Sequence, residues 1–281
     1  MKESYIIFLI VLAAGCIGAA FIYYHGMAND GSANDTSIND SITVPENSSV
    51  HDAEEPERFY FFRGADGHDV QVWNSTGMLI FMTQMMIDAD GSPRAYHPMP
   101  DSYLGTDDLE NAGEGSEWWA LALDGSGDPC VQGADDPYPG FYVSTTALAD
   151  EENEDDCDPA KYVDSEEIPY FVLPEEVFYA SGARLGDIGM VMNTQNGRKA
   201  YAILADLNNN HRMGEGSIAL ARELGIDPDP RTGGEESDVV IYAIFTGSGK
   251  WLPMGKEEIT KAGQELSATY GDVENIYAGL E

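Results

Sequence analysis

The sequence predicts a mostly β fold of the α+β class, in which one barrel-like β domain carries two or three helices. Three observations predict this class. From residue 58 onward, short apolar runs rich in β-branched and aromatic residues dominate, Gly, Asp, Asn and Pro separate these runs, and helical spacing is confined to two segments. Short runs between turn residues are typical of strands in a barrel or a sandwich. No repeat divides residues 58–281, so we expect a single domain there.

An apolar segment begins the chain. Residues 5–24 contain no charged side chain and follow Lys2. As a helix they would span about 30 Å, the thickness of a bilayer core. Residues 1–24 are therefore expected to be an apolar helix that serves as a membrane anchor or as a cleaved signal peptide, and Ala13 to Cys16 also resemble a lipoprotein cleavage site. Each alternative exports the rest of the chain, to the cell surface or to the extracellular space.

An acidic segment follows, at residues 25–57. It holds eight Asp and Glu residues and no Lys or Arg. With so few apolar residues it cannot bury enough surface to fold, so we predict a disordered linker. Three triplets in it fit the N-glycosylation pattern, beginning at Asn34, Asn39 and Asn47. They are either acceptor sites or chance occurrences in a segment rich in Asn and Ser.

The elements of the folded part follow from length, composition and turn signals. Eight apolar segments are expected to be strands: 59–62, 70–73, 78–87, 118–123, 170–173, 188–192, 199–204 and 239–245. The dipeptide Asn196-Gly197 predicts a hairpin between the sixth and seventh of them. Helices are expected at 215–224, where Gly225 provides the stop, and at 256–268.

The charge of the chain excludes one class of partner. Fourteen basic and 50 acidic residues give a formal net charge of −36. Such a surface repels phosphate, so we predict no nucleic-acid partner. It is compatible with a cationic substrate or with a salty habitat. The five His residues show no ligand spacing, and we predict neither a metal nor a cofactor.

Two cysteines belong to the folded part. Cys130 and Cys157 lie 27 residues apart, on either side of an acidic, loop-like stretch. In an oxidising compartment a lone pair of cysteines is usually bonded. We expect a disulfide that stabilises this stretch by about 3 kcal/mol.

One segment places two carboxylates close to a single loop. An apolar strand leads into Asp206, a polar loop follows, and Glu215 is expected at the start of a helix. Hydrolysis of a glycosidic bond requires one protonated and one ionised carboxyl group, which makes this pair a catalytic candidate. Two other interpretations stay open. Asp206, Asn208 and Asn210 imitate the spacing of a calcium loop, and the whole segment also fits a solvated loop.

A second acidic group ends the long strand that starts at residue 78. Asp88 and Asp90 lie in an Asp-Gly turn. Their side chains either only stabilise the turn or bind a cationic sugar. Tyr96 and Trp118 are expected to stack on sugar rings or to pack in the core. Together with Asn208, these four residues are the candidate substrate-binding residues.

Three segments resemble the fungal-type chitosanases of glycoside hydrolase family 75. They are Met85 to Gly91 (MMIDADG), Ile168 to Pro174 (IPYFVLP), and Ala200 to Asp206 continuing through Gly214 to Ser217. The resemblance implies a secreted, endo-acting hydrolase of chitosan that inverts the anomeric centre, with Asp206 and Glu215 as its essential carboxylates. Ala89 stands where the fungal motif has Cys, and Gly216 where it has Ala. Residues 101–164 lie outside the resemblance.

Two hypotheses follow. The first is an exported or anchored glycosidase that cleaves a cationic amino-sugar polymer, and the second is a non-catalytic cell-surface module that binds polysaccharide or calcium. They differ in whether Asp206 and Glu215 face one site.

Overall fold

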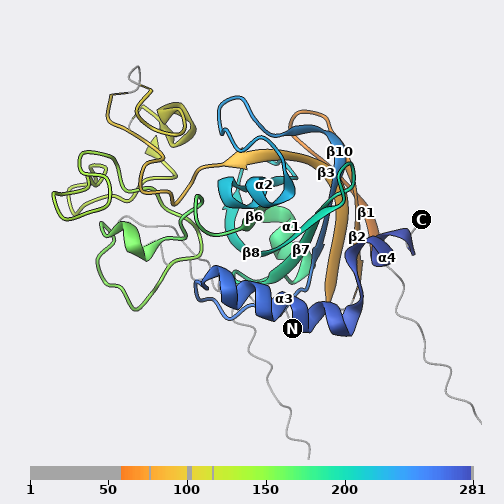
Figure 1. Ribbon diagram of the computed structural model, residues 1–281. Helices are drawn as coiled ribbons and strands as arrows, with labels where there is room; N and C mark the ends of the chain where they lie inside the picture. The colour runs from red at the N-terminus through yellow and green to blue at the C-terminus, as the bar shows by residue number, and fades with distance from the viewer. Residues whose placement is uncertain (1–57, 76, 100–102, 116, 280–281) are drawn as a thin grey trace, which may run out of the picture. The chain divides into compact units, whose positions relative to one another are not determined.

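The computed structural model describes residues 58–75, 77–99, 103–115 and 117–279 (Figure 1). The expected apolar helix of residues 1–24, the acidic linker and the three glycosylation triplets lie outside the described residues. Within those residues, every helix is too short or too polar to cross a membrane.

Six strands form a closed barrel. They lie in the order β3, β10, β7, β8, β6 and β9, and β9 pairs with β3 to close the ring. Their bounds are Met78–Asp88 for β3, Glu235–Ile244 for β10, Ile188–Asn193 for β7, Arg198–Asn208 for β8, Tyr170–Pro174 for β6 and Glu215–Ser217 for β9. Beyond β3 the sheet continues through β2 (Asp69–Ser75) to β1 (Arg58–Arg63). The predicted barrel-like, mostly β fold is confirmed.

Apolar side chains that point alternately to the two faces of the strands form two apolar cores. On β3, Leu79 and Phe81 belong to one core and Ile80 to the other, because successive side chains point to opposite faces. Phe81 stacks on Tyr242 of β10, with ring centroids 4.8 Å apart. The second core takes in Ile259 of helix α3 (Lys256–Tyr270), which lies across the lower end of the barrel in Figure 1.

Four α-helices accompany the described strands. They are α1 (Glu175–Ser181), α2 (Ile218–Leu224), α3 (Lys256–Tyr270) and α4 (Val273–Ala278). The two expected helices are confirmed as α2 and α3, but the predicted start of α2 at Glu215 is wrong. Ser217 caps this helix by accepting a hydrogen bond from the Leu220 N–H, and the three residues before Ile218 pair as strand β9. Gly225 ends the helix at φ 67°, as predicted.

Seven of the eight expected strands are confirmed. The strand expected at 118–123 is wrong for most of its length. Only Glu117–Trp118 (β5) pairs, with Gly113–Glu114 (β4), and further on Leu121 and Leu123 each make one isolated bridge. The predicted hairpin joins β7 to β8, and the Gly197 N–H donates to the Asn193 carbonyl at 2.9 Å.

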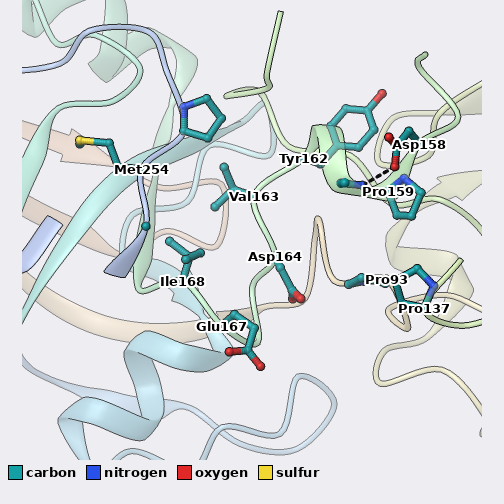
Figure 2. Close-up of a pocket in the computed structure, with 13 residues that line it drawn as sticks. Pro93, Pro137, Asp158, Pro159, Tyr162, Val163, Asp164, Glu167, Ile168 and Met254 are labelled. Carbon is teal, nitrogen blue, oxygen red and sulfur yellow. Dashed lines mark hydrogen bonds between the residues drawn. The ribbon is translucent and has the colours of Figure 1, made fainter. Parts of the chain in front are cut away.

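The long connection from β3 to β6 is mostly irregular (Figure 1). Together with the segment before α3 it borders a pocket of about 460 Å³, shown in Figure 2. Apolar side chains, including Val163, Ile168 and Met254, share the lining with three carboxylates, Asp158, Asp164 and Glu167. Burial raises the pKa of Asp164 to about 6.

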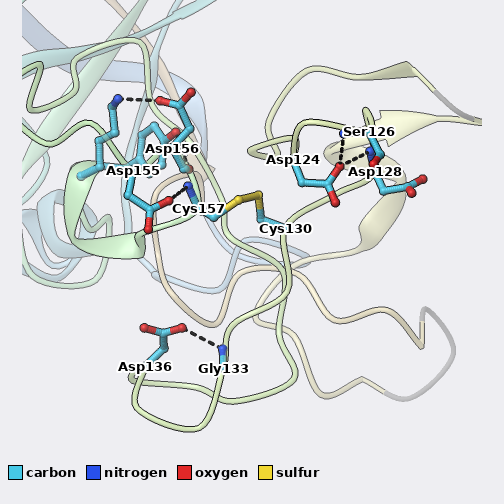
Figure 3. Close-up of a disulfide and its surroundings, with 11 residues drawn as sticks. Asp124, Ser126, Asp128, Cys130, Gly133, Asp136, Asp155, Asp156 and Cys157 are labelled. Carbon is cyan, nitrogen blue, oxygen red and sulfur yellow. Dashed lines mark hydrogen bonds and ion pairs between the residues drawn. A yellow bond between two sulfur atoms is a disulfide. The ribbon is translucent and has the colours of Figure 1, made fainter.

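The predicted disulfide links two parts of this long connection. Cys130 and Cys157 are bonded, with their Cα atoms 5.5 Å apart (Figure 3). Around the bond, acidic side chains close tight turns: Asp155 accepts the N–H of Cys157 at 2.9 Å. The loop closed by the disulfide contains Ala147, whose backbone enters the site described next.

Candidate active site

Strand β6 brings the two catalytic candidates together. Val172 pairs with Asp206 of β8 on one side and with Glu215 of β9 on the other. Partners on adjacent strands project from the same face of a sheet, so both carboxylates share one face. The register of β6 against β8 shifts between Phe171 and Val172, which brings Asp206 rather than Ala205 opposite Val172. A bulge of this kind re-aims a side chain and is frequent beside active sites.

Backbone donors fix the Asp206 carboxylate. Its Oδ1 accepts the N–H of Leu207 at 2.8 Å and the N–H of Ala147 at 3.0 Å. Burial raises the pKa of Asp206 well above its usual range, and the nearby Asp88 charge adds to this, while the two N–H donors act in the opposite direction.

Among the described residues, one side chain donates a hydrogen bond to Glu215. Its Oε2 accepts the Asn208 side-chain amide at 2.9 Å, and that amide also donates to the Arg212 carbonyl at 2.9 Å. Burial, followed by the charge of Asp88, raises the pKa of Glu215 to about 8, although Asn208 and Arg212 lower it. Glu215 lies in β9 and not in the first turn of α2, which is where a helix dipole stabilises a negative charge most.

Asp88 and Asp90 join the same group. Asp88 ends β3 opposite Ser217 of β9, where it is 8% exposed. Its Oδ1 accepts the Asp90 N–H at 2.8 Å. One carboxylate oxygen from each of Asp88, Asp90 and Asp206 lies within 4.8 Å of the others. These oxygens are close enough to surround a cation, and two of the three carboxylates also accept backbone N–H groups, Asp88 from Asp90 and Asp206 from Leu207 and Ala147.

The family model that matches this chain covers the whole group. It describes the fungal chitosanase of glycosyl hydrolase group 75 and matches residues 85–272. The chain belongs to this family. The enzyme is therefore a glycoside hydrolase, and all four carboxylates lie within the matched residues. No curated protein matches the chain.

Two tyrosines complete the acidic group of this chitosanase-family enzyme. The Tyr96 hydroxyl donates to Asp90 Oδ1 at 2.6 Å, and the Tyr170 hydroxyl donates to the Asp90 carbonyl at 2.9 Å. Burial raises the pKa of Asp90 well above its usual range, and repulsion from Asp88 and Asp206 raises it further. Carboxyl groups this close in a buried site cannot all ionise, so the group retains protons at neutral pH.

The aromatic candidates occupy different positions in the fold. Tyr96 is 2% exposed, so its ring has no free face for a sugar, and it reaches the site through its hydroxyl. Trp118 is half-buried and packs beside Tyr142, with ring centroids 6.2 Å apart.

Sequence reasoning missed two residues of the site. Tyr170 stands in an apolar strand, where nothing in the sequence marks its hydroxyl as functional. Asp107 comes from the irregular connection, where it is held by two hydrogen bonds from the Asn111 amide. Its negative charge raises the pKa of both Asp88 and Glu215. No motif in the sequence distinguishes Asp107 from the other acidic residues of that connection.

The remaining interpretations of the acidic segments can be compared with this geometry. Asp206 and Asn208 lie in strand β8, and the amide of Asn208 points to Glu215, so these residues do not form the loop of a calcium site. The pocket of Figure 2 is lined by none of the four carboxylates Asp88, Asp90, Asp206 and Glu215. The acidic group and that pocket therefore consist of different residues.

Proposed function

We propose that the chain is an endo-acting, inverting hydrolase of chitosan or a related amino-sugar polysaccharide, with Glu215 as general acid and Asp206 as general base. The observation that carries this proposal is the pairing of both residues with Val172. Membership of a chitosanase family supports the substrate class.

The hydrogen-bond donors favour this division of roles. The two N–H groups at Asp206 stabilise its ionised form and hold it in place to activate water. Glu215 accepts only the Asn208 amide, and its pKa of about 8 keeps it protonated at neutral pH. A protonated carboxyl group is what the leaving oxygen of a glycosidic bond requires.

The spacing of the strands supports inversion. Adjacent strands lie about 4.8 Å apart, so one intervening strand separates the Cα atoms of Asp206 and Glu215 by about 10 Å. Inverting enzymes hold their carboxyl groups about 6.5–9.5 Å apart, which leaves room for the attacking water. Retaining enzymes need about 5–5.5 Å. The two strand spacings leave room for a water molecule between the two side chains, which supports the first class.

We assign the substrate contacts to the partly exposed residues in and around the acidic group. Asp90, Asn208 and Trp118 are all partly exposed, and we include them among the residues that touch the polymer. A polymer carrying ammonium groups would also be attracted by the net charge of −36.

Export is part of the proposal. The disulfide between Cys130 and Cys157 is typical of an oxidising compartment, and a polysaccharide substrate lies outside the cell. Residues 5–24 would direct export, either as a cleaved signal peptide or as a membrane anchor. Partition of the full chain between membrane and soluble fractions distinguishes these two fates.

Product analysis tests the function. The enzyme should release reducing ends from chitosan, assayed beside chitin and peptidoglycan, and the first products should carry the anomeric configuration opposite to that of the substrate. Retention of configuration would exclude the inverting mechanism. Tight binding of chitosan without any hydrolysis would replace the hydrolase with the non-catalytic binding module.

A further inference from the structure

Asp88 is the least exposed of the four carboxylates that form the acidic group. It is 8% exposed, whereas Asp90, Asp206 and Glu215 are each partly exposed. This leaves little surface for the role in substrate binding expected from its turn motif. Glu215 pairs with Met86 of β3, so Asp88, two residues further along that strand, projects from the same face as Glu215.

Two neutral donors favour the ionised form of Asp88. The Asp90 N–H donates to its Oδ1 at 2.8 Å, and the Tyr170 hydroxyl also stabilises its charged form. Burial, which has the largest effect, opposes ionisation, and so does the negative charge of Asp107. The pKa of Asp88 is therefore raised, and once Asp88 is ionised these two donors hold its charge.

We propose that Asp88 is a positioning residue that keeps the leaving-group proton on Glu215 by presenting a fixed negative charge from the end of β3. This inference rests on the proposed function, in which Glu215 is the general acid. It assigns Asp88 a role through another residue and not through contact with substrate.

Glu215 is surrounded by groups from several elements. Beside Asp88, they are Arg212 in the loop before β9, Asp107 in the long connection, Asn208 and Asp206 in β8, Asp90 after β3 and the Tyr242 hydroxyl in β10. Among the charges that act on Glu215, Asp88 has the largest effect. The opposing cation, Arg212, is exposed at the surface, where solvent screens it.

The order of ionisation supports the proposal. Burial raises the pKa of Asp88 to about 6, and burial together with Asp88 raises that of Glu215 to about 8. As the pH rises, Asp88 therefore ionises first, and its charge delays the ionisation of Glu215. Between these two values Asp88 is an anion and Glu215 keeps its proton, which is the protonation state that a general acid at Glu215 requires.

The test is the titration of Glu215 in the intact enzyme and in Asp88→Asn. The Glu215 carboxyl is followed by carbon NMR in protein labelled at the Glu side chain, and its signal is assigned by its loss in Glu215→Gln. Removing a like charge should lower the pKa of Glu215 by about one unit or more. The basic limb of the kcat profile against pH should move to lower pH by the same amount, with the rate on the acid side of the optimum kept.

Three further variants control this test. Asp88→Glu keeps the charge and should retain most of the parental pKa. Asp164→Asn removes another carboxyl group of raised pKa, one that lies in the pocket of Figure 2, and should leave the titration unchanged. If Asp88→Asn does not fold, Tyr170→Phe removes the hydroxyl that stabilises ionised Asp88 and donates to the Asp90 carbonyl, and it should shift the pKa of Glu215 in the same direction by less.

The outcomes separate this inference from the proposed function. An unchanged pKa of Glu215 in folded Asp88→Asn overturns the positioning role, whatever happens to activity. An unchanged basic limb with a raised KM also overturns it and makes Asp88 a substrate contact. If Glu215→Gln retains full activity, the proposed function fails instead, while the titration of Glu215 still reports on its electrostatic link to Asp88.

Discussion

At the scale of single residues, the site depends on where two carboxyl groups keep their protons. Asp206 is held by backbone N–H groups and Glu215 by one side-chain amide, so the two are chemically different although both are acidic. This asymmetry is what acid–base catalysis of hydrolysis needs.

Isosteric substitution of either carboxyl group should abolish most activity. Asp206→Asn and Glu215→Gln keep the shape of the side chain but remove the exchangeable proton and the charge. Each should lower kcat on chitosan by about 10²-fold or more, since one general acid or base contributes about 10²–10⁴-fold. Release of reducing ends measures the loss. Asp69→Asn, an exposed carboxylate on β2, is the matched control and should keep the parental rate.

The same protons make stability depend on pH. Burial raises the pKa of Glu215 to about 8 and that of Asp88 to about 6, above ordinary values of about 4 in the unfolded chain. The folded state therefore binds more protons than the unfolded state between about pH 4 and 8, and the free energy of unfolding falls as the pH rises through that range. Thermal melts at pH 5 and pH 8 should show a lower Tm at pH 8. Glu215→Gln should flatten this dependence, and an equally steep curve in that variant would contradict the explanation.

Much of the site was visible in the sequence, and what was missed has a physical reason. Asp206, Glu215, Asp88 and Asp90 stand in recognisable segments, and the structure brings them together. The hydroxyl of Tyr170 and the burial of Tyr96 depend on which face of a strand or loop meets the site. Residue spacing does not contain that information, because it arises from packing between segments distant in the chain.

At the scale of elements, β9 is the shortest strand of the barrel and the one that carries Glu215. Its three residues precede Ile218 without any apolar alternation, so helix signals dominated the sequence prediction there. Long strands such as β3 and β8 were predictable because their alternation extends over many residues.

Gly214 lets β9 reach β3. Its φ is 83°, and a Cβ there would lie 2.2 Å from the Gln84 carbonyl oxygen and 2.6 Å from Thr83 Cγ2. Its own carbonyl accepts the Met86 N–H at 2.7 Å. Gly214→Ala should therefore destabilise the domain by more than about 1 kcal/mol and also lower kcat, because Glu215 would move with the backbone.

A second glycine provides the control for this substitution. Gly197 has a similar φ of 72° with nothing within 4 Å of a Cβ. Gly197→Ala should show only the conformational cost of its backbone region and keep the parental kcat. Urea unfolding and reducing-end assays of both variants measure the difference. Equal effects on kcat would show that Gly214 does not position Glu215.

At the scale of the whole molecule, the irregular connection from β3 to β6 and the barrel both contribute groups to one site. The disulfide closes the loop that contains Ala147, and the Ala147 N–H donates to Asp206. Reducing the bond, or the double substitution of Cys130 and Cys157 by Ser, should lower the free energy of unfolding by about 3 kcal/mol. It should also lower kcat more than KM changes, since the lost order lies at Asp206, the proposed general base. Melts and kinetics with and without reductant test this, and unchanged kcat in the reduced enzyme would contradict it.

Net charge should govern how the substrate reaches the enzyme. With a formal charge of −36, the enzyme should bind a cationic polymer more weakly as salt is added. KM for chitosan should rise with ionic strength while kcat changes little. A fully acetylated oligosaccharide of the same length, measured for binding, is the uncharged control and should show a weaker salt dependence. Equal salt dependence for both ligands would remove the electrostatic explanation.

The place of Val172 between Asp206 and Glu215 has a consequence for the evolution of the reaction. The separation of the Cα atoms of these two residues is a property of hydrogen-bonded backbone, set by two strand spacings of about 4.8 Å each. Exchanges of side chains on β6 leave that separation unchanged. With these two residues as the proposed acid and base, changes in the surrounding loops would alter substrate preference, whereas the stereochemical outcome would be inherited with the sheet and would change only if a strand were lost or a carboxylate moved to the neighbouring one.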